Sequence, residues 1–599
     1  MRAARHRAHR KHRPVRVLAV AALAASAVTA PALLSTAGAD PVFTEQNLHF
    51  RVFVGPDRSQ ECDIVGILVT PTVATSSNKV PAILTTNGFG GSASDQVPFA
   101  EKEAALGYVV LSYSGLGFGG SDCKITLDDP DWDGVAASQL VSYLGGASGI
   151  AFLDDAHTQP APTLDVVKRD VLDHNNHLST NDPRVGMWGG SYGGEIQFAA
   201  ASVDARIDAI NPQITWNDLS YSLGPNNTNQ TTGVSTGNPG AVKVNWGLGF
   251  SAEGIFDGAQ NFPTDESRFI GCPNFADFVC PALVTAGTTG YFQPGDIAHL
   301  RHASVSSYLS KIKIPVLLDQ GQTDTLFQLN EAVATYKALK AQNNKVAMLW
   351  REQGHSGGTP TDAGRAYENT RIQNWFDHYL KGSSVGTGSA FAYYRDWTGT
   401  FAEANSYPVG SNKTYYLTAA NALTSSVLGI KGGSQTFVTP PAGAPTTLGP
   451  LDALGGVVPV PPLPDTNVQG TYAYWSTPAL SSPLTVVGAP LCTVKISAPS
   501  AELTSGDPAG QVVLFAKIYD VAPDGTASLI KGLVAPIRVP DPTKAIKITL
   551  PAIAHQFAAG HSIKLMIAGG DVNYRGGLTP TAVTISTGST GQTLVLPTV

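Results

Sequence analysis

A serine, an aspartate and a histidine stand in the chain in the order and the local settings that nucleophilic acyl transfer requires. Ser191 lies in Gly189-Gly190-Ser191-Tyr192-Gly193, between an apolar run that predicts a strand (185–188) and a small-residue run that predicts a helix (196–203). A Gly-x-Ser-x-Gly turn in this setting is typical of a nucleophile elbow, where side chains larger than hydrogen beside the serine would collide. The sequence therefore predicts Ser191 as a nucleophile.

The proton acceptor and its orienting acid are predicted from their places after later strands. A serine hydroxyl attacks efficiently only when a histidine takes its proton and an acid fixes the histidine tautomer. With this elbow the chain order is serine, acid, histidine. His355 lies on a glycine-flanked loop directly after the apolar run 346–350, and we predict it as the base. Asp324 is the predicted acid, and Asp319, closer to the preceding strand, is the alternative.

A second Gly-x-Ser-x-Gly match, Gly354-His355-Ser356-Gly357-Gly358, surrounds the predicted base. No helix-like run follows it at once, so Ser356 lacks the elbow setting and is interpreted as a loop residue. The oxyanion hole needs two N–H donors aimed at the charge that develops on the substrate oxygen. We predict the backbone amides of Tyr192, directly after the nucleophile, and of Phe89, in the loop after an early strand.

The elements that must hold these residues alternate between strand and helix. Apolar runs at 81–86, 108–113, 185–188, 207–210, 315–318 and 346–350 are mostly separated by helix-length segments such as 133–144 and 329–340. This alternation is typical of a mainly parallel sheet covered by helices, whose sites lie at the carboxyl ends of the strands. Asn87, Ser191, Asp324 and His355 all fall at such ends.

The stretches around this catalytic part differ from it in pattern. Between 211 and 309 the alternation weakens, and aromatic residues and two cysteines predict an insertion that caps the site. Beyond Tyr415, strand-like runs separated by Gly, Pro, Asp and Asn predict a C-terminal β-sandwich or jelly roll. The predicted parts are a signal peptide (1–39), a catalytic domain (40–210 and 310–400), a cap insertion (211–309) and a C-terminal β domain (401–599).

Residues 1–39 are typical of an export signal. Seven Arg and Lys without any acid lie between Arg2 and Arg16, an apolar run follows from 17 to 34, and Ala37-Gly38-Ala39 offers a cleavage site. A retained membrane anchor is the alternative, although the run is weakly hydrophobic for a membrane span. Cleavage removes seven of 39 Lys and Arg and leaves 32 against 46 Asp and Glu, a net charge of about −14 instead of −7. This charge argues against nucleic-acid and anionic-membrane partners.

Five cysteines in an exported chain predict two disulfides and one free thiol. Cys272 with Cys280 and Cys62 with Cys123 are the expected pairs, which leaves Cys492 free. No histidine pair with metal-ligand spacing accompanies the thiols, so we predict no metal site.

Several segments resemble the X-Pro dipeptidyl-peptidase and cocaine-esterase-like family of serine hydrolases. They are the elbow, the positions of Asp324 and His355, the segment 375–382, and the C-terminal runs 482–490, 514–521 and 557–565. The resemblance covers nearly the whole chain after residue 39. It implies an α/β-hydrolase catalytic domain with a helical cap insertion, an all-β jelly-roll (galactose-binding-like) C-terminal domain, and cofactor-free acyl transfer through an acyl-enzyme.

Two segments depart from that family. Asn87-Gly88-Phe89-Gly90 stands where many relatives carry Arg-x-Pro-Tyr, whose tyrosine hydroxyl serves the oxyanion hole, so a backbone donor must replace it here. Tyr113-Ser114-Gly115 lacks the frequent Arg-Gly. The acyl-transfer chemistry survives both changes, but the family's substrate specificity does not carry over.

The expected activity is that of a secreted serine hydrolase, in the first place an X-Pro dipeptidyl-peptidase acting on small peptides. An acyl esterase of the cocaine-esterase type is the alternative, and an exported binding protein with a vestigial hydrolase core is a candidate of another class. The peptidase needs a group for the free amino terminus, for which Glu253, Asp257 and Asp265 are available. No cofactor, nucleic-acid partner or, after signal cleavage, membrane partner is expected. The natural substrate and the oligomeric state stay open.

Overall fold

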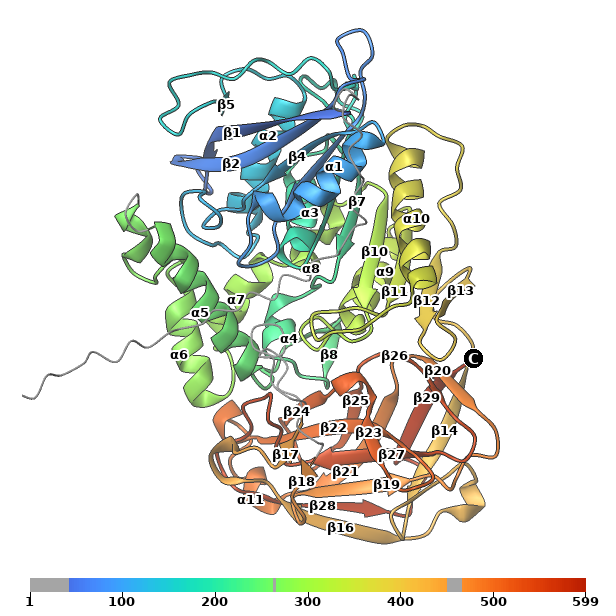
Figure 1. Ribbon diagram of the computed structural model, residues 1–599. Coiled ribbons are helices and arrows are strands. Elements are labelled where there is room, and N and C mark those ends of the chain that lie inside the picture. Colours follow the sequence, from blue (N-terminus) through green and yellow to red (C-terminus); the bar gives the residue numbers. More distant parts are fainter. Residues whose placement is uncertain (1–41, 262–264, 450–465) are drawn as a thin grey trace, which may run out of the picture.

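The computed structural model describes residues 42–261, 265–449 and 466–599 (Figure 1). The predicted signal peptide lies outside these residues. None of the helices within them is both long enough and apolar enough to span a membrane. An α/β domain, a helical cap beside it and a β domain that contacts both make up the described chain (Figure 1).

An eleven-stranded sheet forms the centre of the α/β domain, in the order β13-β12-β11-β10-β7-β6-β3-β4-β2-β1-β5. In this order across the sheet, the neighbouring strands from β12 to β4 pair in parallel. Antiparallel pairs extend the sheet at both edges. Their bounds are β1 (Phe43–Val54), β2 (Gln60–Pro71), β3 (Ala82–Thr86), β4 (Val109–Tyr113), β5 (Ala151–Phe152), β6 (Val185–Gly190), β7 (Ile207–Gln213), β10 (Val316–Gly321), β11 (Val346–Arg351), β12 (Phe391–Arg395) and β13 (Thr400–Ala404).

Helices cover both faces of this sheet, because successive residues of each central strand point to opposite sides. On β3, Leu84 belongs to one core cluster and Ile83 to another. The helices of the first cluster are α2 (Val135–Leu144), α3 (Tyr192–Val203) and α9 (Leu329–Ala341), and those of the second are α1 (Val97–Ala105) and α10 (Asp362–Tyr379). The predicted alternation is confirmed, and the domain is an α/β hydrolase.

The sheet is larger than the sequence predicted, and two domain bounds move with it. Phe391 of β12 pairs antiparallel with Ala404 of β13, so the sheet continues past residue 400, where the catalytic domain was predicted to end. β7 likewise runs on to Gln213, beyond the predicted start of the cap at 211. β1 and β2 are long antiparallel strands that the alternating sequence pattern did not predict.

The cap is the segment between β7 and β10. Its described residues include five α-helices and a small hairpin: α4 (Leu219–Leu223), β8 (Gln230–Thr232), β9 (Ser235–Thr236), α5 (Val244–Asn261), α6 (Val279–Thr289), α7 (Pro294–His302) and α8 (Val305–Tyr308). The predicted helical cap is therefore present, with a β-hairpin that was not predicted.

The β domain is a largely antiparallel assembly packed around its own apolar cluster. In the described residues its strands are β14 (Ser411–Thr418), β15 (Ala422–Thr424), β16 (Gly433–Val438), β17 (Thr447–Leu448), β18 (Thr466–Asn467), β19 (Tyr472–Ser476), β20 (Leu484–Gly488), β21 (Leu491–Ser497), β22 (Val512–Val521), β23 (Ala527–Leu529), β24 (Ala535–Val539), β25 (Ala545–Thr549), β26 (Ile553–Phe557), β27 (Ser562–Ala568), β28 (Ala582–Thr587) and β29 (Thr593–Thr598), and a short α-helix, α11 (Pro499–Glu502), lies among them.

A buried arginine joins the β domain to the cap. Arg538 of β24 donates from Nε to the carbonyl of Gly240 at 3.0 Å and from Nη2 to that of Gly290 at 3.2 Å, and its guanidinium lies 4.8 Å from the Tyr291 ring centre. Only 1% of Arg538 is exposed, so these contacts replace its hydration. These contacts of Arg538 fix the cap to the β domain.

The cysteines pair as the sequence predicts. Cys62 is bonded to Cys123 and Cys272 to Cys280, and Cys492 is a free, buried thiol. The first disulfide ties β2 to the loop after β4 across 61 residues, and the second closes a loop of 8 residues within the cap.

We expect the two disulfides to contribute unequally to stability. By the chain-entropy relation, the 61-residue link contributes about 4 kcal/mol and the 8-residue link about 2.5 kcal/mol to the free energy of unfolding. Urea unfolding of the double variant Cys62→Ala/Cys123→Ala should show the larger loss, with Cys272→Ala/Cys280→Ala as its matched control. An equal or smaller loss in the first variant would contradict this ranking.

Candidate active site

The turn between β6 and α3 has elbow geometry. Ser191 stands at the N-terminus of α3 with φ 58° and ψ −120°, a backbone conformation that is costly for a residue with a side chain. A Cβ on Gly189 would lie 2.6 Å from the carbonyl oxygen of Gly193, and a Cβ on Gly193 would lie 2.7 Å from that of Thr86. Both glycines are therefore required by close packing of the turn, as the sequence predicts.

The structure brings the three residues predicted as a triad together. Ser191 Oγ lies 2.8 Å from His355 Nε2, and His355 Nδ1 lies 2.7 Å from Asp324 Oδ2. Asp324 is fully buried, and its Oδ1 accepts the backbone N–H groups of Leu326 and Phe327 at 3.0 and 2.7 Å. Because an ionised carboxylate only accepts hydrogen bonds, Nδ1 carries the histidine proton, and Nε2 is left to accept the proton of Ser191.

Asp319, the alternative acid, has a different partner. It lies within β10, 1% exposed, with Oδ2 3.4 Å from Nη1 of Arg351. Arg351 also binds Glu368 at 2.8 Å. Burial raises the pKa of Asp319 above the usual aspartate range, and the Arg351 cation opposes that rise. The carboxylate bonded to His355 is that of Asp324.

Ser356, the serine of the second Gly-x-Ser-x-Gly match, is exposed on the loop that follows β11. Its Oγ lies 2.5 Å from Oγ1 of Thr325 and accepts the Thr325 N–H at 3.3 Å. No helix begins directly after it, since α10 starts only at Asp362, and His355 directs its Nε2 to Ser191 instead.

The loops that carry Asp324 and His355 are tied to each other and to the cap. Thr323 Oγ1 donates to the carbonyl of Glu352 at 2.9 Å and accepts the N–H of Gly354 at 3.1 Å. Lys243, directly before α5, donates from Nζ to the carbonyls of Thr325 and Leu326, both at 2.7 Å. Sequence reasoning missed Lys243, because a lysine that binds backbone carbonyls leaves no motif.

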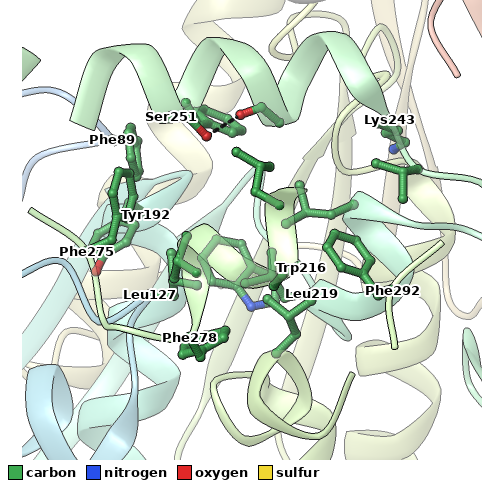
Figure 2. Close-up of a pocket in the computed structure, with 18 of the residues that line it drawn as sticks. Phe89, Leu127, Tyr192, Trp216, Leu219, Lys243, Ser251, Phe275, Phe278 and Phe292 are labelled. Carbon is green, nitrogen blue, oxygen red and sulfur yellow. Dashed lines mark hydrogen bonds between the residues drawn. The ribbon is translucent and has the colours of Figure 1, made fainter. Parts of the chain in front are cut away.

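An apolar cavity of about 100 Å³ lies between the elbow and the cap, and Ser191 is one of the residues that line it. Figure 2 shows lining side chains, among them Phe89, Tyr192 and Trp216. Its polar lining groups besides Ser191 and Tyr192 are Lys243 and Ser251, whose Oγ donates to the carbonyl of Gly247. Gly247 completes the wall, and the remaining lining residues are apolar: Phe89, Leu127, Trp216, Leu219, Leu223, Val242, Phe250, Phe275, Phe278, Val279, Ala282, Leu283, Phe292, Leu300 and Phe327.

The residues predicted for the oxyanion hole lie beside this cavity. Tyr192 is the first residue of α3, and the Phe89 ring lies edge-on to the Tyr192 ring with centroids 6.0 Å apart. Phe89 also contacts Phe118 and Phe250 at centroid distances of 5.1 and 4.9 Å, so its loop is held between the α/β domain and the cap.

The sequence matches models of known protein families. The family model of the X-Pro dipeptidyl-peptidase (S15 family) matches residues 64–244, and that of the X-Pro dipeptidyl-peptidase C-terminal non-catalytic domain matches residues 387–595. The chain belongs to the X-Pro dipeptidyl-peptidase and cocaine-esterase-like family. It is accordingly a serine hydrolase, and the prolyl oligopeptidase family model matches residues 281–383. No protein of curated function matches the sequence.

Solved structures share the fold of this family member over almost its whole length. An aminopeptidase from a marine sediment Thaumarchaeota archaeon is 14% identical with a TM-score of 0.65, over 95% of this chain and 99% of that one. An alpha-amino acid ester hydrolase is 15% identical, with a TM-score of 0.62 over 96% and 100%. A CocE/NonD family hydrolase from Staphylococcus aureus is 13% identical, with a TM-score of 0.58 over 94% and 97%.

Glu253, one of the three carboxylates available for a substrate amine, lies against the predicted oxyanion loop. A Cβ on Gly90 would lie 2.1 Å from Glu253 Oε1, so the carboxylate rests against the loop of Phe89. Desolvation raises the pKa of Glu253 above the usual glutamate range. Asp257 follows one turn later on α5, and Asp265 accepts the N–H of Ser267 at the start of a short helix. None of the three is among the residues that line the apolar cavity.

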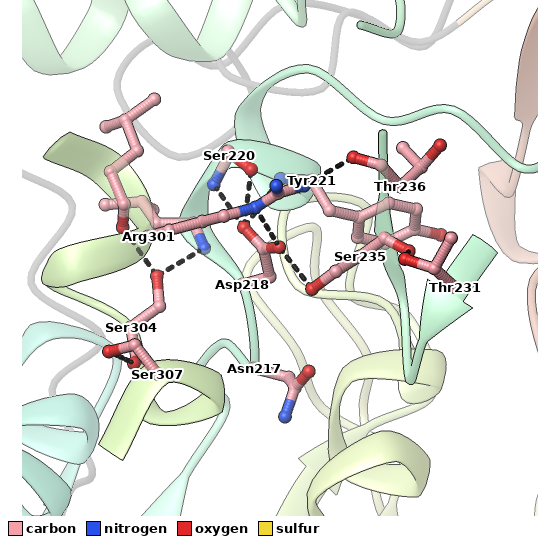
Figure 3. A network of polar contacts seen from close by, with 12 residues as sticks. Asn217, Asp218, Ser220, Tyr221, Thr231, Ser235, Thr236, Arg301, Ser304 and Ser307 are labelled. Atoms are coloured by element: carbon pink, nitrogen blue, oxygen red, sulfur yellow. Dashed lines mark hydrogen bonds and ion pairs between the residues drawn. The ribbon is translucent and has the colours of Figure 1, made fainter. Parts of the chain in front are cut away.

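A buried carboxylate ties several parts of the cap to one another (Figure 3). Asp218 Oδ1 accepts the N–H groups of Ser220 and Tyr221 at 3.0 and 3.3 Å, and Oδ2 accepts from Arg301 Nε of α7 at 3.0 Å. Ser235 of the hairpin donates to the same Oδ2. Three parts of the cap therefore converge on one charge that is fully buried.

Behind the elbow, Tyr192 is anchored by a second buried acid. Its hydroxyl accepts the Asp128 N–H at 3.1 Å and lies 3.5 Å from Oδ2 of Asp133, which also binds Thr126. Burial raises the pKa of Asp133 to about 7. Asp133 therefore stays protonated in the folded protein at pH values where the unfolded chain has released that proton.

This difference between the folded and unfolded pKa predicts that Asp133→Asn stabilises the protein by an amount that depends on pH. For an acid with a raised folded pKa, the free energy of unfolding falls as the pH rises from about 4 to about 7. Asparagine keeps an acceptor for Thr126 but has no proton to lose, so the variant should gain stability relative to wild type between pH 5 and pH 8. Chemical unfolding of both proteins at pH 5 and pH 8 measures the difference in their free energies of unfolding. A difference that is the same at both pH values would contradict a raised pKa of Asp133.

Proposed function

We propose that this chain is a secreted serine hydrolase that cleaves esters with a small apolar acyl group, with Ser191, His355 and Asp324 as its catalytic triad. The observation that carries the proposal is that a serine in elbow geometry, hydrogen-bonded to a histidine at 2.8 Å, lines an apolar cavity. Export is supported by the pattern of residues 1–39 and by two disulfides, which persist in oxidising compartments.

The geometry supplies each proton transfer of acyl transfer. His355 Nε2 takes the proton of Ser191 as Oγ attacks the carbonyl carbon, and the buried Asp324 carboxylate stabilises the imidazolium that forms. The backbone amides of Tyr192 and Phe89 are the proposed donors to the oxyanion. The imidazolium then protonates the leaving oxygen, and His355 activates a water that releases the acyl group from Ser191.

The volume and the lining of the cavity favour a small apolar acyl group. Its volume of about 100 Å³ is of the scale of a cavity that holds one benzene ring, about 150 Å³. A charged or strongly polar acyl group would lose its hydration there without gaining partners, because Lys243 and Ser251 already donate to backbone carbonyls. Short aliphatic and single-ring acyl groups suit these walls.

A second candidate, an X-Pro dipeptidyl-peptidase, is favoured by the position of Glu253. A proline ring also suits a small apolar cavity, and the peptide's ammonium group then needs a carboxylate. Glu253 lies against Gly90, beside the proposed oxyanion donor Phe89, and its pKa is raised by desolvation. The side chain is exposed on α5, so an ammonium group can reach it and pair with its carboxylate.

The triad predicts a large difference between two serine variants. Ser191→Ala should lower kcat by about 10⁴-fold or more, because the covalent step is lost. Ser356→Ala, in the other Gly-x-Ser-x-Gly sequence, is the matched control and should lower kcat by less than about tenfold. Hydrolysis of p-nitrophenyl butyrate and benzoate by the purified variants measures both. A Ser191→Ala variant that keeps its activity would overturn the proposal.

The substrate class is tested with a matched pair of substrates and one charge change. Wild-type enzyme should hydrolyse the apolar acyl esters faster than Ala-Pro p-nitroanilide, and Glu253→Gln should leave ester hydrolysis unchanged. If Ala-Pro p-nitroanilide is the better substrate and Glu253→Gln lowers its kcat/KM at least about tenfold, the protein is the dipeptidyl-peptidase instead. The ratio of the two kcat/KM values decides between the candidates.

A further inference from the structure

A lysine of the β domain reaches the loop that carries His355. Lys531 stands in a tight turn between β23 and β24 with φ 50°, a left-handed backbone that residues with side chains rarely adopt. Its side chain is only 8% exposed and extends toward the α/β domain, where its partners lie. Such a strained turn persists only where other contacts hold it.

The partners of Lys531 are two carboxylates of the α/β domain. Its Nζ lies 3.2 and 3.0 Å from the two oxygens of Glu352 and 3.1 Å from Asp396 Oδ2. The Glu352 side chain is 12% exposed, so solvent screens this ion pair weakly. The pair joins two domains across 179 residues of sequence.

Glu352 is in turn part of the connection between the two catalytic loops. It precedes His355 by three residues, and its carbonyl accepts both the N–H and the Oγ1–H of Thr323 at 3.3 and 2.9 Å. Thr323 is the neighbour of Asp324. The Lys531 ammonium is therefore bonded to the His355 loop directly and to the Asp324 loop through one further residue.

The rest of the turn adds contacts to the acid loop. A Cβ on Gly532 would lie 3.6 Å from Thr325 Cγ2, and Gln328 Nε2 donates to the carbonyl of Val534 at 3.1 Å. Segment 531–534 of the β domain thus touches the loops after β10 and after β11, at the edge where the serine, acid and histidine meet.

From these contacts we infer that Lys531 is a positioning residue for the triad, through which the β domain sets the place of the His355 imidazole. The inference rests on the proposed function of Ser191, His355 and Asp324. Loss of the ammonium leaves the Glu352 carboxylate poorly solvated and without its main partner, so the loop is expected to shift. A displacement of about 1 Å at a catalytic group lowers turnover by about 100-fold.

The test compares four single variants and one double variant by steady-state ester hydrolysis and thermal unfolding. Lys531→Met removes the charge, and Lys531→Asn removes it with a residue that tolerates a left-handed backbone, so at least one of them should fold. Lys531→Arg keeps a cation. Lys547→Met, at an exposed position on β25 of the same domain, is the matched control.

We expect Lys531→Met and Lys531→Asn to lower kcat about 10- to 100-fold with KM within twofold of wild type, because the acyl cavity is untouched. Lys531→Arg should recover at least a third of the wild-type kcat, and Lys547→Met should match wild type. A second rescue is the double variant Lys531→Met/Glu352→Gln, which should exceed Lys531→Met in kcat because the poorly solvated Glu352 charge is removed, whereas the Asp396 side chain is 38% exposed and can be hydrated.

Folded Lys531→Met and Lys531→Asn variants with wild-type kcat would overturn the inference, and so would a loss that Lys531→Arg does not restore. These outcomes are separate from failure of the proposed function itself. In that case the wild-type protein neither turns over esters nor reacts at Ser191 with a fluorophosphonate, whatever residue occupies position 531.

Discussion

The hydrogen bond between His355 and the buried Asp324 carboxylate is the interaction on which the site depends. At 2.7 Å it fixes the proton on Nδ1 and directs Nε2 to Ser191. A carboxylate with no solvent exposure is stable only if its other oxygen is satisfied, and the N–H groups of Leu326 and Phe327 provide that. The acid loop must therefore hold one conformation, and much of the surrounding structure serves to hold it.

The parallel sheet brings the catalytic loops together, but contacts beyond the sheet hold them in place. β10 and β11 are neighbours in register, with Asp319 opposite Leu349, so the loops after them leave the same edge of the sheet. Beyond that edge Thr323 links the two loops, and Lys243 of the cap donates to the carbonyls of Thr325 and Leu326. The same cap supplies most of the cavity wall, so the insertion both shapes the acyl site and supports the acid loop.

Local patterns were sufficient to predict the elbow, the alternating strands and helices and the choice of Asp324 over Asp319. Each of these rests on residues close together in sequence. The glycines at 189 and 193 are an example, because the close packing of the turn leaves no room for a side chain there. The roles of Lys243 and Lys531 had no such signal, because their partners lie 82 and 179 residues away and are selected by tertiary packing. The β12–β13 hairpin was also missed, although its strands are close in sequence, and the predicted end of the catalytic domain fell four residues short of Ala404.

The most direct measurement of the central claim is the site of covalent labelling by a fluorophosphonate. The wild-type protein is treated with the probe, digested and mapped by peptide mass spectrometry, with the His355→Ala variant alongside. The account predicts one adduct, on Ser191, that forms far more slowly when His355 is replaced. An adduct on Ser356 or on another serine, or labelling of Ser191 at an unchanged rate without His355, would contradict it.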